Sequence, residues 1–330
     1  MDGTSDVKES KAANLEAFLP AAARRYGAAQ TAIPKLARDE EALASIEQAL
    51  TLVPTRHKLR LHDATQLSFL PPKSVHLVVT SPPYWTLKEY NDHSRQLGHV
   101  EDYDEFLGQL RQVWEHCFNA LVPGGRLVCV VGDVCLSRRQ NKGRHTVVPL
   151  HASIQEQCRK IGYDNLAPII WHKIANAKFE ASRNSSFLGK PYEPNAVIKN
   201  DIEFILMLRK PGGYRSPTLT EKLFSVIGER NHKVWFQQIW TDVKGASTRS
   251  HPAPYPIELA KRLVRMFSFV GDTVLDPFLG SGTTAIAAAL TGRSSIGTEI
   301  DPAYLKLAAA RFDSEVGGLV SAAALQVEGT

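Results

Sequence analysis

Short apolar runs alternate with helical segments over most of the chain from Leu59 onward, and this alternation limits the fold more than any other feature. Runs typical of buried strands lie at 75–80, 127–131, 167–171, 273–275 and 294–298. Between them, Tyr103–Leu121 carries apolar side chains at helical spacing and ends before Pro123-Gly124-Gly125. Strands that alternate with helices form a parallel sheet covered on both faces. The sequence therefore predicts an α/β protein with a doubly wound, mostly parallel sheet.

The alternation weakens between residues 174 and 250, where the chain is polar, basic and interrupted by glycine and proline. This segment holds seven Lys and five Arg against seven Asp plus Glu, a surplus equal to the net charge of +5 of the whole chain. A run of charge is usually a solvated face, but a concentrated basic surplus also suits a polyanionic partner. Apart from the apolar run 204–208, we expect an insertion that lies over the sheet. Residues 1–55 read instead as two Ala-rich helices, at 11–30 and 36–52.

The composition excludes several classes of protein. The 330 residues are 43% hydrophobic and 22% charged, as in ordinary globular proteins. No run approaches the roughly 18 apolar residues that a membrane span needs, and the first residues lack the basic and apolar parts of a secretory signal. The four cysteines form no C-x-x-C pair, which disfavours a zinc site or a disulfide framework. We therefore expect a protein of the cytoplasm without a metal site.

The hexapeptide Thr80-Ser81-Pro82-Pro83-Tyr84-Trp85 follows the apolar run 75–79. Consecutive prolines are restricted in φ and donate no backbone hydrogen bonds, so the strand must end there in a stiff turn. The carbonyls and the Ser81 hydroxyl are then free to accept hydrogen bonds beside an aromatic pair. Such an arrangement suits a planar base held by its amino group. On the hexapeptide alone, a plain loop in which Tyr84 and Trp85 only pack is equally compatible.

A second motif lies between a predicted strand and a predicted helix, at Asp276-Pro277-Phe278-Leu279-Gly280-Ser281-Gly282-Thr283. Its glycines let the backbone approach a ligand, and the helix start offers amide donors. Glu299 ends the next strand, where a carboxylate can accept the hydroxyls of a ribose. The lack of Gly-Lys-Ser/Thr after the glycines excludes a P-loop. An adenosine-type cofactor is predicted, although a simple helix-start turn stays open. Nicotinamide dinucleotide and S-adenosylmethionine are both compatible, and Asp276 favours the latter because a carboxylate suits a cationic amine better than a pyrophosphate.

Together the two motifs resemble those of the amino-group DNA methyltransferases, which modify N4 of cytosine or N6 of adenine. That family carries a S/D/N-P-P-Y/F/W tetrapeptide and a D-P-F-x-G-S-G-T loop, which match residues 81–84 and 276–283. Segments 169–173 and 251–256 resemble further family motifs, so the resemblance extends over residues 59 to about 312. The order of catalytic motif, basic insertion and cofactor loop is similar to the permuted β group.

The resemblance implies a Rossmann-like methyltransferase fold with a mostly parallel seven-stranded sheet, S-adenosylmethionine as the cofactor and double-stranded DNA as the substrate. The implied regions are a catalytic half (56–173), a target-recognition region (174–250) and a cofactor-binding half (251–316). The sequence pattern itself adds an N-terminal helical extension (1–55), which matches no family motif, and a flexible tail (317–330).

The resemblance also assigns roles to individual residues. The catalytic residues would be Ser81, Pro82, Pro83 and Tyr84, with Trp85 as a wall of the base pocket. The cofactor would be contacted by Asp63, Asp276, Phe278, Gly280, Ser281, Gly282, Thr283 and Glu299. For Asp63 an ordinary strand-end cap stays open. The basic residues expected to contact DNA are Lys178, Arg183, Lys190, Lys199, Arg215, Lys233, Lys244 and Arg249.

The expected chemistry is positioning rather than covalent catalysis. An exocyclic amine is a poor nucleophile because its lone pair is delocalised into the ring. Acceptance of its two hydrogens by Ser81 Oγ and the Pro82 carbonyl would localise that pair on nitrogen. The base must first be flipped out of the duplex and stacked, with Tyr84 as the platform. Serine at the first motif position accompanies cytosine more often in this family, so N4 of cytosine is narrowly favoured over N6 of adenine.

Other activities are less compatible with the sequence. Methylation of cytosine C5 needs a nucleophilic cysteine, usually after proline, and no cysteine here follows proline. The zinc signature of base deaminases is also missing. A catalytically idle DNA-binding module and a nicotinamide-dependent oxidoreductase stay open as remote alternatives. No nuclease motif is evident, so a cognate restriction endonuclease would be a separate partner, and an orphan regulatory role is equally compatible. Homodimerisation through the N-terminal helices stays open, and we expect a bacterial enzyme at the nucleoid.

Overall fold

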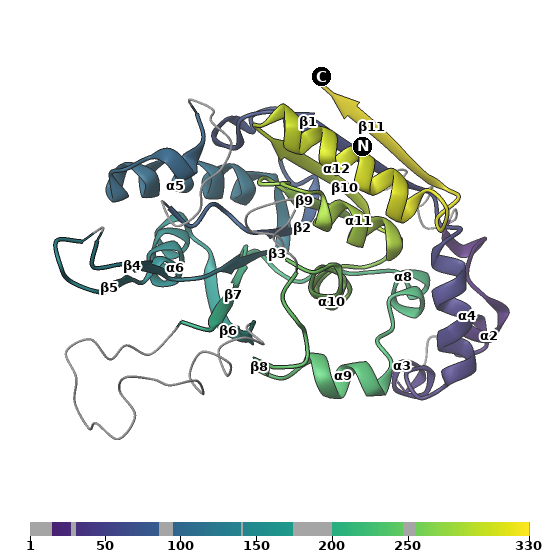
Figure 1. Cartoon of the computed structure of the whole chain (residues 1–330). Coiled ribbons are helices and arrows are strands. Elements are labelled where there is room, and N and C mark those ends of the chain that lie inside the picture. Colours follow the sequence, from purple (N-terminus) through teal and green to yellow (C-terminus); the bar gives the residue numbers. More distant parts are fainter. Residues whose placement is uncertain are drawn as a thin grey trace, which may run out of the picture.

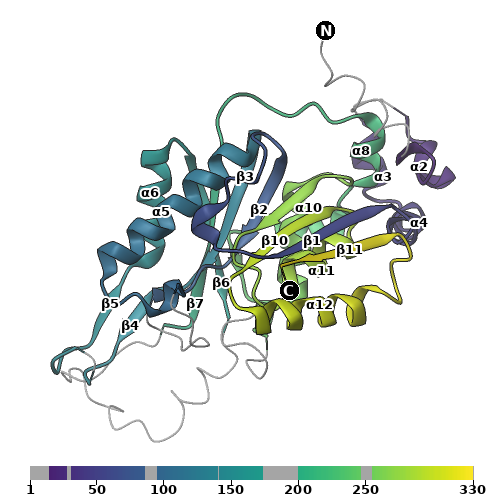
Figure 2. The same cartoon turned by 90° about the horizontal axis from the view of Figure 1, so that it is seen from above.

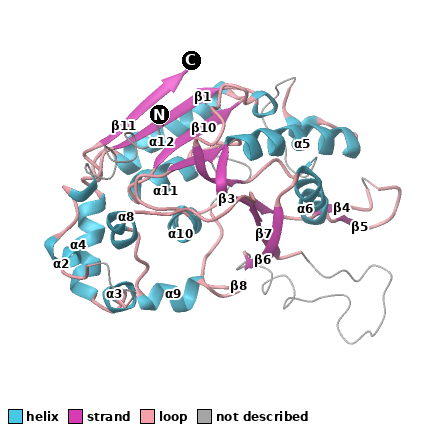
Figure 3. Ribbon diagram, turned by 180° about the vertical axis from the view of Figure 1, so that it is seen from behind, coloured by secondary structure: helices cyan, strands magenta, loops and turns pink. Residues whose placement is uncertain are grey.

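The structure is a computed structural model that describes residues 15–27, 31–85, 95–139, 141–173, 200–246 and 255–329. Within these residues the chain forms one large sheet between two layers of helices (Figures 1 and 3). From one edge to the other, the strands are β11 (Ala323–Glu328), β1 (Thr55–Leu61), β10 (Ser294–Glu299), β9 (Thr273–Asp276), β2 (Val75–Thr80), β3 (Leu121–Val131), β7 (Ile202–Arg209), β6 (Asp164–His172) and β8 (Ile239–Trp240). A separate ribbon pairs β4 (Val134–Leu136) with β5 (Thr146–Val148).

The helices are α2 (Ala21–Arg24), α3 (Ala32–Leu36), α4 (Glu40–Leu50), α5 (Tyr103–Ala120), α6 (Leu150–Ile161), α8 (Leu219–Phe224), α9 (Glu229–Trp235), α10 (Ile257–Phe267), α11 (Thr283–Leu290) and α12 (Pro302–Val316), with 3₁₀ turns η1 (Ala64–Gln66) and η3 (Leu97–His99). In the described part of the chain, no helix is long and apolar enough to cross a bilayer.

The sheet is mostly parallel, which confirms the predicted α/β class. Only β7 runs against its neighbours, β3 and β6, and the other adjacent strands are parallel. The expected count of seven strands is wrong, because the described sheet has nine. The additional strands are the short β8 at one edge and β11 at the other.

The flexible tail predicted for 317–330 is also corrected by strand β11. Its residues pair in parallel with β1 over the whole register from Thr55↔Ala323 to Arg60↔Glu328. The Arg60 guanidinium lies 2.6 Å from the Glu328 carboxylate. An open edge strand readily takes up another strand, and β11 supplies one to β1.

The alternation of side chains along β3 explains the two layers of helices. Leu127, Cys129 and Val131 belong to a buried cluster with helices α5 and α6. Val128 and Val130 point to the opposite face and belong to a cluster with helix α10. Successive residues of a strand face opposite sides, so an uninterrupted apolar run needs cover on both faces.

The apolar run 204–208, which the sequence set apart from the predicted insertion, lies in strand β7 between β3 and β6. In the rest of the described segment, residues 200–246, the short strand β8 pairs with β6 at the edge of the sheet. Trp235 and Trp240, from α9 and β8, are buried in the core cluster that contains α10. Short elements of this segment, such as α9 and β8, are not evident from its polar sequence because they pack against residues distant in the chain. Residues 174–199 lie outside the described residues.

The N-terminal residues form shorter helices than predicted. Pro34 lies inside α3, and α4 begins at Glu40 behind the Asp39 side chain, which accepts a hydrogen bond from Ala42 N. Leu36, Ile46 and Leu50 pack with Phe224 of α8 in a small separate core. Packing within the protein therefore covers the apolar faces of these helices.

The topology brings two distant loops together. Strands β2 and β9 are parallel neighbours, with Leu77 paired with Val274 and Val78 with Leu275. The carboxyl ends of parallel neighbours lie at the same edge of a sheet. The loop after Thr80 and the loop after Asp276 therefore emerge side by side, as a shared site requires.

Candidate active site

A direct hydrogen bond joins the two motifs. Thr80 Oγ1, at the end of β2, donates to Asp276 Oδ1, at the end of β9, over 2.7 Å. Asp276 Oδ2 also accepts from Thr284 Oγ1 at 2.6 Å and Tyr255 Oη at 3.2 Å. Phe278 N donates to Oδ1 at 3.1 Å. Thr80 and Thr284 belong to β2 and α11, so the Asp276 carboxylate holds β2, β9 and α11 together.

Asp276 is thus placed behind the site rather than in its wall. Its residue is 2% exposed and does not line the cavity described below. Burial raises the pKa of its carboxyl, while the hydrogen bonds from Thr284 and Thr80 oppose that shift. The sequence-based expectation of a direct contact to a ligand's amine is therefore not met by this arrangement. Hydrogen-bond donors of the protein itself occupy both oxygens of the Asp276 carboxylate.

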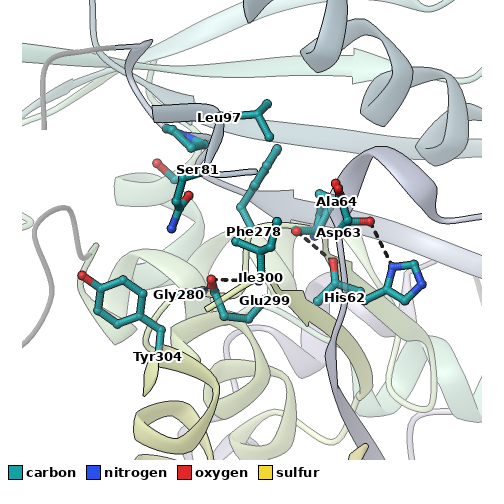
Figure 4. A pocket seen from close by; sticks show the side chains of 14 residues that line it. His62, Asp63, Ala64, Ser81, Leu97, Phe278, Gly280, Glu299, Ile300 and Tyr304 are labelled. Atoms are coloured by element: carbon teal, nitrogen blue, oxygen red, sulfur yellow. Dashed lines mark hydrogen bonds between the residues drawn. The ribbon is translucent and has the colours of Figure 1, made fainter. Parts of the chain in front are cut away.

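A cavity of about 570 Å³, open to solvent, lies where the two loops meet (Figure 4). Its wall combines residues that follow four neighbouring parallel strands, β1, β2, β9 and β10. The lining residues are His62, Asp63, Ala64, Ser81, Pro83, Gln96, Leu97, Pro277, Phe278, Gly280, Thr298, Glu299, Ile300 and Tyr304. Its position at the carboxyl ends of the strands is the usual one for ligands of open α/β sheets.

Glu299 is a buried carboxylate in this wall. Its residue is 8% exposed, and it accepts three backbone hydrogen bonds, from Gly280 N at 2.8 Å and from Ile300 N and Asp301 N at 3.0 Å each. Burial raises the pKa of Glu299 to about 7, against the opposing effect of these amides. A carboxylate held this rigidly still has lone pairs available for hydroxyl groups of a ligand.

Asp63 both caps a turn and faces the cavity. Its Oδ1 accepts from Thr65 N at 2.9 Å and Thr65 Oγ1 at 2.7 Å, which starts η1. Its Oδ2 lies 3.6 Å from Arg95 Nη1. The two readings of Asp63 left open by the sequence, a strand-end cap and a ligand contact, are therefore compatible with each other.

Ser81 and Pro83 line the same cavity from the β2 side. Ser81 Oγ lies 3.3 Å from Tyr84 Oη, and the Tyr84 ring is buried against Gly132, where an added Cβ would stand 3.2 Å from Tyr84 Cε2. Tyr84, at 5% exposure, therefore supports Ser81 from the core. A stacking role for its ring stays a prediction.

Trp85 does not line the described cavity. Its indole Nε1 donates to the Val100 carbonyl at 2.8 Å, and its ring packs against Tyr103 with centroids 5.0 Å apart. Its backbone has a φ of +46°, which is rare for a non-glycine residue. In the described residues Trp85 contacts Val100 and Tyr103, and its role as a wall of the base pocket stays a prediction.

The Gly-rich turn divides into a ligand side and a core side. Phe278 and Gly280 line the cavity. Ser281 and Thr283 face helix α12, where Arg311 Nη1 lies 2.8 Å from Ser281 Oγ and 3.4 Å from Thr283 Oγ1. Gly282 has a φ of +82°, and an added Cβ would lie 3.0 Å from Ala308 Cβ. The contacts of Ser281, Gly282 and Thr283 in this structure shape the loop, and their contacts with a ligand stay a prediction.

Several cavity residues have no counterpart in the sequence-based predictions. Ile300 and Tyr304 follow Glu299 closely after the end of β10, so their position behind a predicted strand is a usable signal. Gln96 and Leu97 carry no local signal, because they reach the cavity from a loop whose partners are distant in sequence.

Only three of the eight residues predicted to contact DNA lie in the described part of the chain. Lys178, Arg183, Lys190, Lys199 and Arg249 lie outside the described residues. Lys233 is exposed on α9, where it pairs with Glu229 at 3.3 Å. Lys244 is exposed four residues after β8, at the carboxyl edge of the sheet.

Arg215 is not available for DNA in the predicted way. Its guanidinium holds the buried Asp272 carboxylate, with Nη2 2.6 Å from Oδ1. Asp272 directly precedes β9, so this pair lies at the amino edge of the sheet, opposite the cavity. A buried carboxylate needs a cationic partner, and the sequence alone does not show that Asp272 is buried.

An open α/β sheet with a cavity at the carboxyl ends of its strands, walled by a buried glutamate, is the arrangement of a Rossmann-like fold that binds a nucleotide-type cofactor. Comparison with known proteins narrows this class. The family model described as DNA methylase, with N6 and N4 specificity in its name, matches residues 75–310. The chain therefore belongs to the N6/N4 DNA methylase family.

Individual relatives agree with this assignment. The chain is 36% identical over 280 residues to the Type II methyltransferase M.MjaI of Methanocaldococcus jannaschii, covering 76% of this chain and 88% of that protein. It is 33% identical over 282 residues to M.MthZI of Methanothermobacter thermautotrophicus, covering 78% and 77%.

Among solved structures, the putative DNA modification methylase TTHA0409 of Thermus thermophilus, complexed with S-adenosyl-L-methionine, is 51% identical with a TM-score of 0.68. That match covers 83% of this chain and 99% of the other. The PvuII DNA methyltransferase, described as cytosine-N4-specific, shares the fold with a TM-score of 0.55 at 17% identity.

Proposed function

We propose that the chain transfers a methyl group from S-adenosylmethionine to an exocyclic amino group of a flipped base in double-stranded DNA. The observation that carries this proposal is the shared cavity, in which Ser81 and Pro83 face Phe278, Gly280 and Glu299. Neither loop alone offers both a base-amino acceptor and an adenosine site. Membership of the DNA methylase family supports the same chemistry.

The cavity residues fit the proposed cofactor. Phe278, Ile300 and Leu97 supply apolar surface for a flat adenine ring (Figure 4). Asp63 and Glu299 supply acceptors for the adenine amino group and the ribose hydroxyls. When bound, S-adenosylmethionine supplies an electrophilic methyl group on a sulfonium. The complex of the Thermus thermophilus methylase with this compound supports the choice over a nicotinamide dinucleotide.

The protein's own residues would act by position. Ser81 Oγ and the Pro82 carbonyl accept the two amino hydrogens, which makes the nitrogen lone pair available to the methyl group. The Thr80–Asp276 hydrogen bond fixes the start of this turn against the cofactor loop. A preorganised set of acceptors needs no covalent intermediate.

For the target base we propose N4 of cytosine, with N6 of adenine as the second candidate. Serine at position 81 is the observation that favours cytosine by resemblance to the family. Its hydroxyl can accept a hydrogen from either amine, so the preference is narrow. Mass spectrometry of nucleosides from methylated DNA decides between them, since N4-methylcytosine is expected and N6-methyladenine would overturn the preference. A homodimer and a cognate restriction endonuclease stay predictions about partners.

The proposed activity is tested by transfer of labelled methyl from S-adenosylmethionine to duplex DNA. Ser81→Ala should lower kcat on the order of 100-fold, because it removes one positioned hydrogen-bonding group from the reacting amine. Cofactor affinity, measured by calorimetry, should stay near that of the wild type. Ser216→Ala, an exposed serine on the opposite edge of the sheet, is the matched control and should change neither quantity.

Absence of methyl transfer by the wild type would overturn the proposal. Loss of cofactor binding in Ser81→Ala would instead show that the two loops have been assigned the wrong roles.

A further inference from the structure

A two-stranded ribbon leaves the sheet at the same edge as the cavity. Strands β4 and β5 pair antiparallel from Val134↔Val148 to Leu136↔Thr146. The ribbon begins three residues after Val131, where β3 ends at the carboxyl edge. Figure 2 shows the ribbon extending away from the sheet. Its base is buried at Val134, and exposure increases from there toward the turn.

The end of this ribbon is strongly basic. Its turn, residues 137–145, carries Arg138, Arg139, Lys142 and Arg144, and the whole ribbon from 134 to 148 contains no Asp or Glu. All four side chains are exposed. Within the described part of the chain, no carboxylate forms an ion pair with Arg139, Lys142 or Arg144. Four cations in nine residues are a large local charge for a chain whose net charge is +5.

Backbone hydrogen bonds join the described residues of this turn, 137–139 and 141–145. Asn141 N donates to the Ser137 carbonyl at 3.0 Å, and Gly143 N donates to the Arg138 carbonyl at 2.9 Å. The Asn141 side chain donates across the turn to Thr146 Oγ1 at 2.9 Å. An ordered turn reduces the entropy lost when its side chains bind a partner.

The base of the ribbon is fixed to the candidate active site. Asp133, between β3 and β4, lies 2.6 Å from His151 Nδ1, and the His151 ring stacks on Phe204 with centroids 3.8 Å apart. The preceding Gly132 packs against the ring of Tyr84. The ribbon is therefore a rigid extension of the strand that supports the Ser81–Tyr84 turn.

The geometry suits a duplex. At about 3.3 Å per residue, the six residues from Val131 to Ser137 carry the turn about 20 Å beyond the end of β3. A two-stranded ribbon of this kind fits the major groove of B-DNA, with phosphates on both sides. Exposed cations without acidic neighbours are what the phosphate backbone attracts.

We propose that the β4–β5 ribbon is a DNA-binding arm whose Arg139, Lys142 and Arg144 contact phosphates of the duplex next to the target base. This inference rests on the proposed function, because it takes duplex DNA as the substrate. The arm lies outside the segment 174–250, to which the sequence analysis assigned all of the expected DNA contacts. Phosphate contacts position a protein on DNA without reading its sequence.

The test compares binding of a nonspecific DNA duplex as a function of salt by the wild type and by Arg139→Gln/Lys142→Gln/Arg144→Gln. Loss of three phosphate contacts should reduce the slope of log K against log salt by about 2.7. The fall in affinity between 50 and 200 mM salt should accordingly shrink by about 40-fold. Cofactor affinity should not change, which shows that the variant is folded.

Two controls separate a phosphate contact from a general effect of charge. Lys35→Gln/Arg56→Gln/Lys160→Gln removes the same charge from exposed positions away from the ribbon and should keep the wild-type slope. Arg139→Lys/Arg144→Lys keeps the cations and should also keep the slope, because a phosphate accepts either side chain. A large loss in this conservative variant would indicate bidentate base contacts and overturn the phosphate assignment.

The proposed DNA-binding arm would be contradicted by an unchanged salt slope in the triple glutamine variant. It would also be contradicted by an equal reduction of the slope in the charge-matched control. Preference of the ribbon for single-stranded RNA over the duplex, or failure of the wild type to bind duplex DNA, would contradict it as well. Failure of the proposed function has a different signature, since it appears as absent methyl transfer by the wild type whatever the salt slope is.

Discussion

At the scale of single residues, Glu299 is the group whose ionisation most affects the candidate site. Burial raises the pKa of its carboxyl from 4.5 to about 7. Because this pKa is higher in the folded state, the folded protein holds a proton between these values that the unfolded chain releases. The contribution of Glu299 to stability is therefore present at low pH and declines as pH rises from about 4.5 to about 7. The affinity for a ligand that needs the ionised Glu299 carboxylate should instead rise with pH over this range.

We therefore predict that affinity for S-adenosylmethionine rises with pH through the neutral range. Ribose hydroxyls donate to an ionised carboxylate, so binding should be about tenfold weaker at pH 6 than at pH 8. Glu299→Gln removes the titrating group and should bind weakly with little dependence on pH. Calorimetry of both proteins across this range isolates the effect from titration of the ligand itself, which is common to both. A wild type whose pH profile matches that of Glu299→Gln would contradict the assignment.

The sequence could predict Glu299 and Gly280 because each follows a strongly predicted strand, where parallel sheets bind ligands. It could not predict which way Asp276 points. The same strand-end position serves a ligand or the core, and the choice depends on Thr80 of β2, Thr284 of α11 and Tyr255 in the loop before α10.

At the scale of elements, local periodicity predicted well and distant pairing predicted poorly. Strand β2 has the predicted bounds, 75–80, and helix α5 begins at the predicted residue, Tyr103, because their apolar patterns are complete within the segment. Strand β11 and the β4–β5 ribbon were missed because they are short and gain their stability from neighbours far along the chain or across a turn. The Thr80–Asp276 bond is likewise a product of the pairing of β2 with β9.

We predict that Thr80→Val weakens the junction between these two strands. The change keeps the shape of the side chain but leaves the buried Asp276 carboxylate with one donor fewer, which should lower the free energy of unfolding by about 1–3 kcal/mol. Urea denaturation measures this loss. Thr273→Val at the amino end of the partner strand, β9, is the control, and its effect should stay within about 0.5 kcal/mol. Equal stability of the two variants would show that the hydrogen bond does not hold the strands.

At the scale of the whole molecule, the basic surplus of 174–250 does not form one patch in the described residues. Arg209 pairs with Asp164 at 2.8 Å, and Arg215 pairs with Asp272 at the amino edge of the sheet. Lys210 Nζ donates to the Phe118 and Leu121 carbonyls at the end of α5. These three cations contact acceptors within the protein, whereas Arg139, Lys142 and Arg144 of the β4–β5 ribbon are exposed. Net charge along a sequence says which sign dominates but not which charges are already neutralised.

The last prediction separates these two uses of positive charge. Arg215→Gln leaves the Asp272 carboxylate, 1% exposed, without its bidentate partner, so the free energy of unfolding should fall by about 3 kcal/mol. Affinity of the folded fraction for duplex DNA should not change, because the pair lies on the edge opposite the cavity. Lys233→Gln removes the same charge from an exposed position and should cost less than about 0.5 kcal/mol. Thermal denaturation and DNA titration of both variants give the comparison. Weakened DNA binding by a fully stable Arg215→Gln variant would contradict this prediction and would indicate that Arg215 contacts DNA, as the sequence analysis expected.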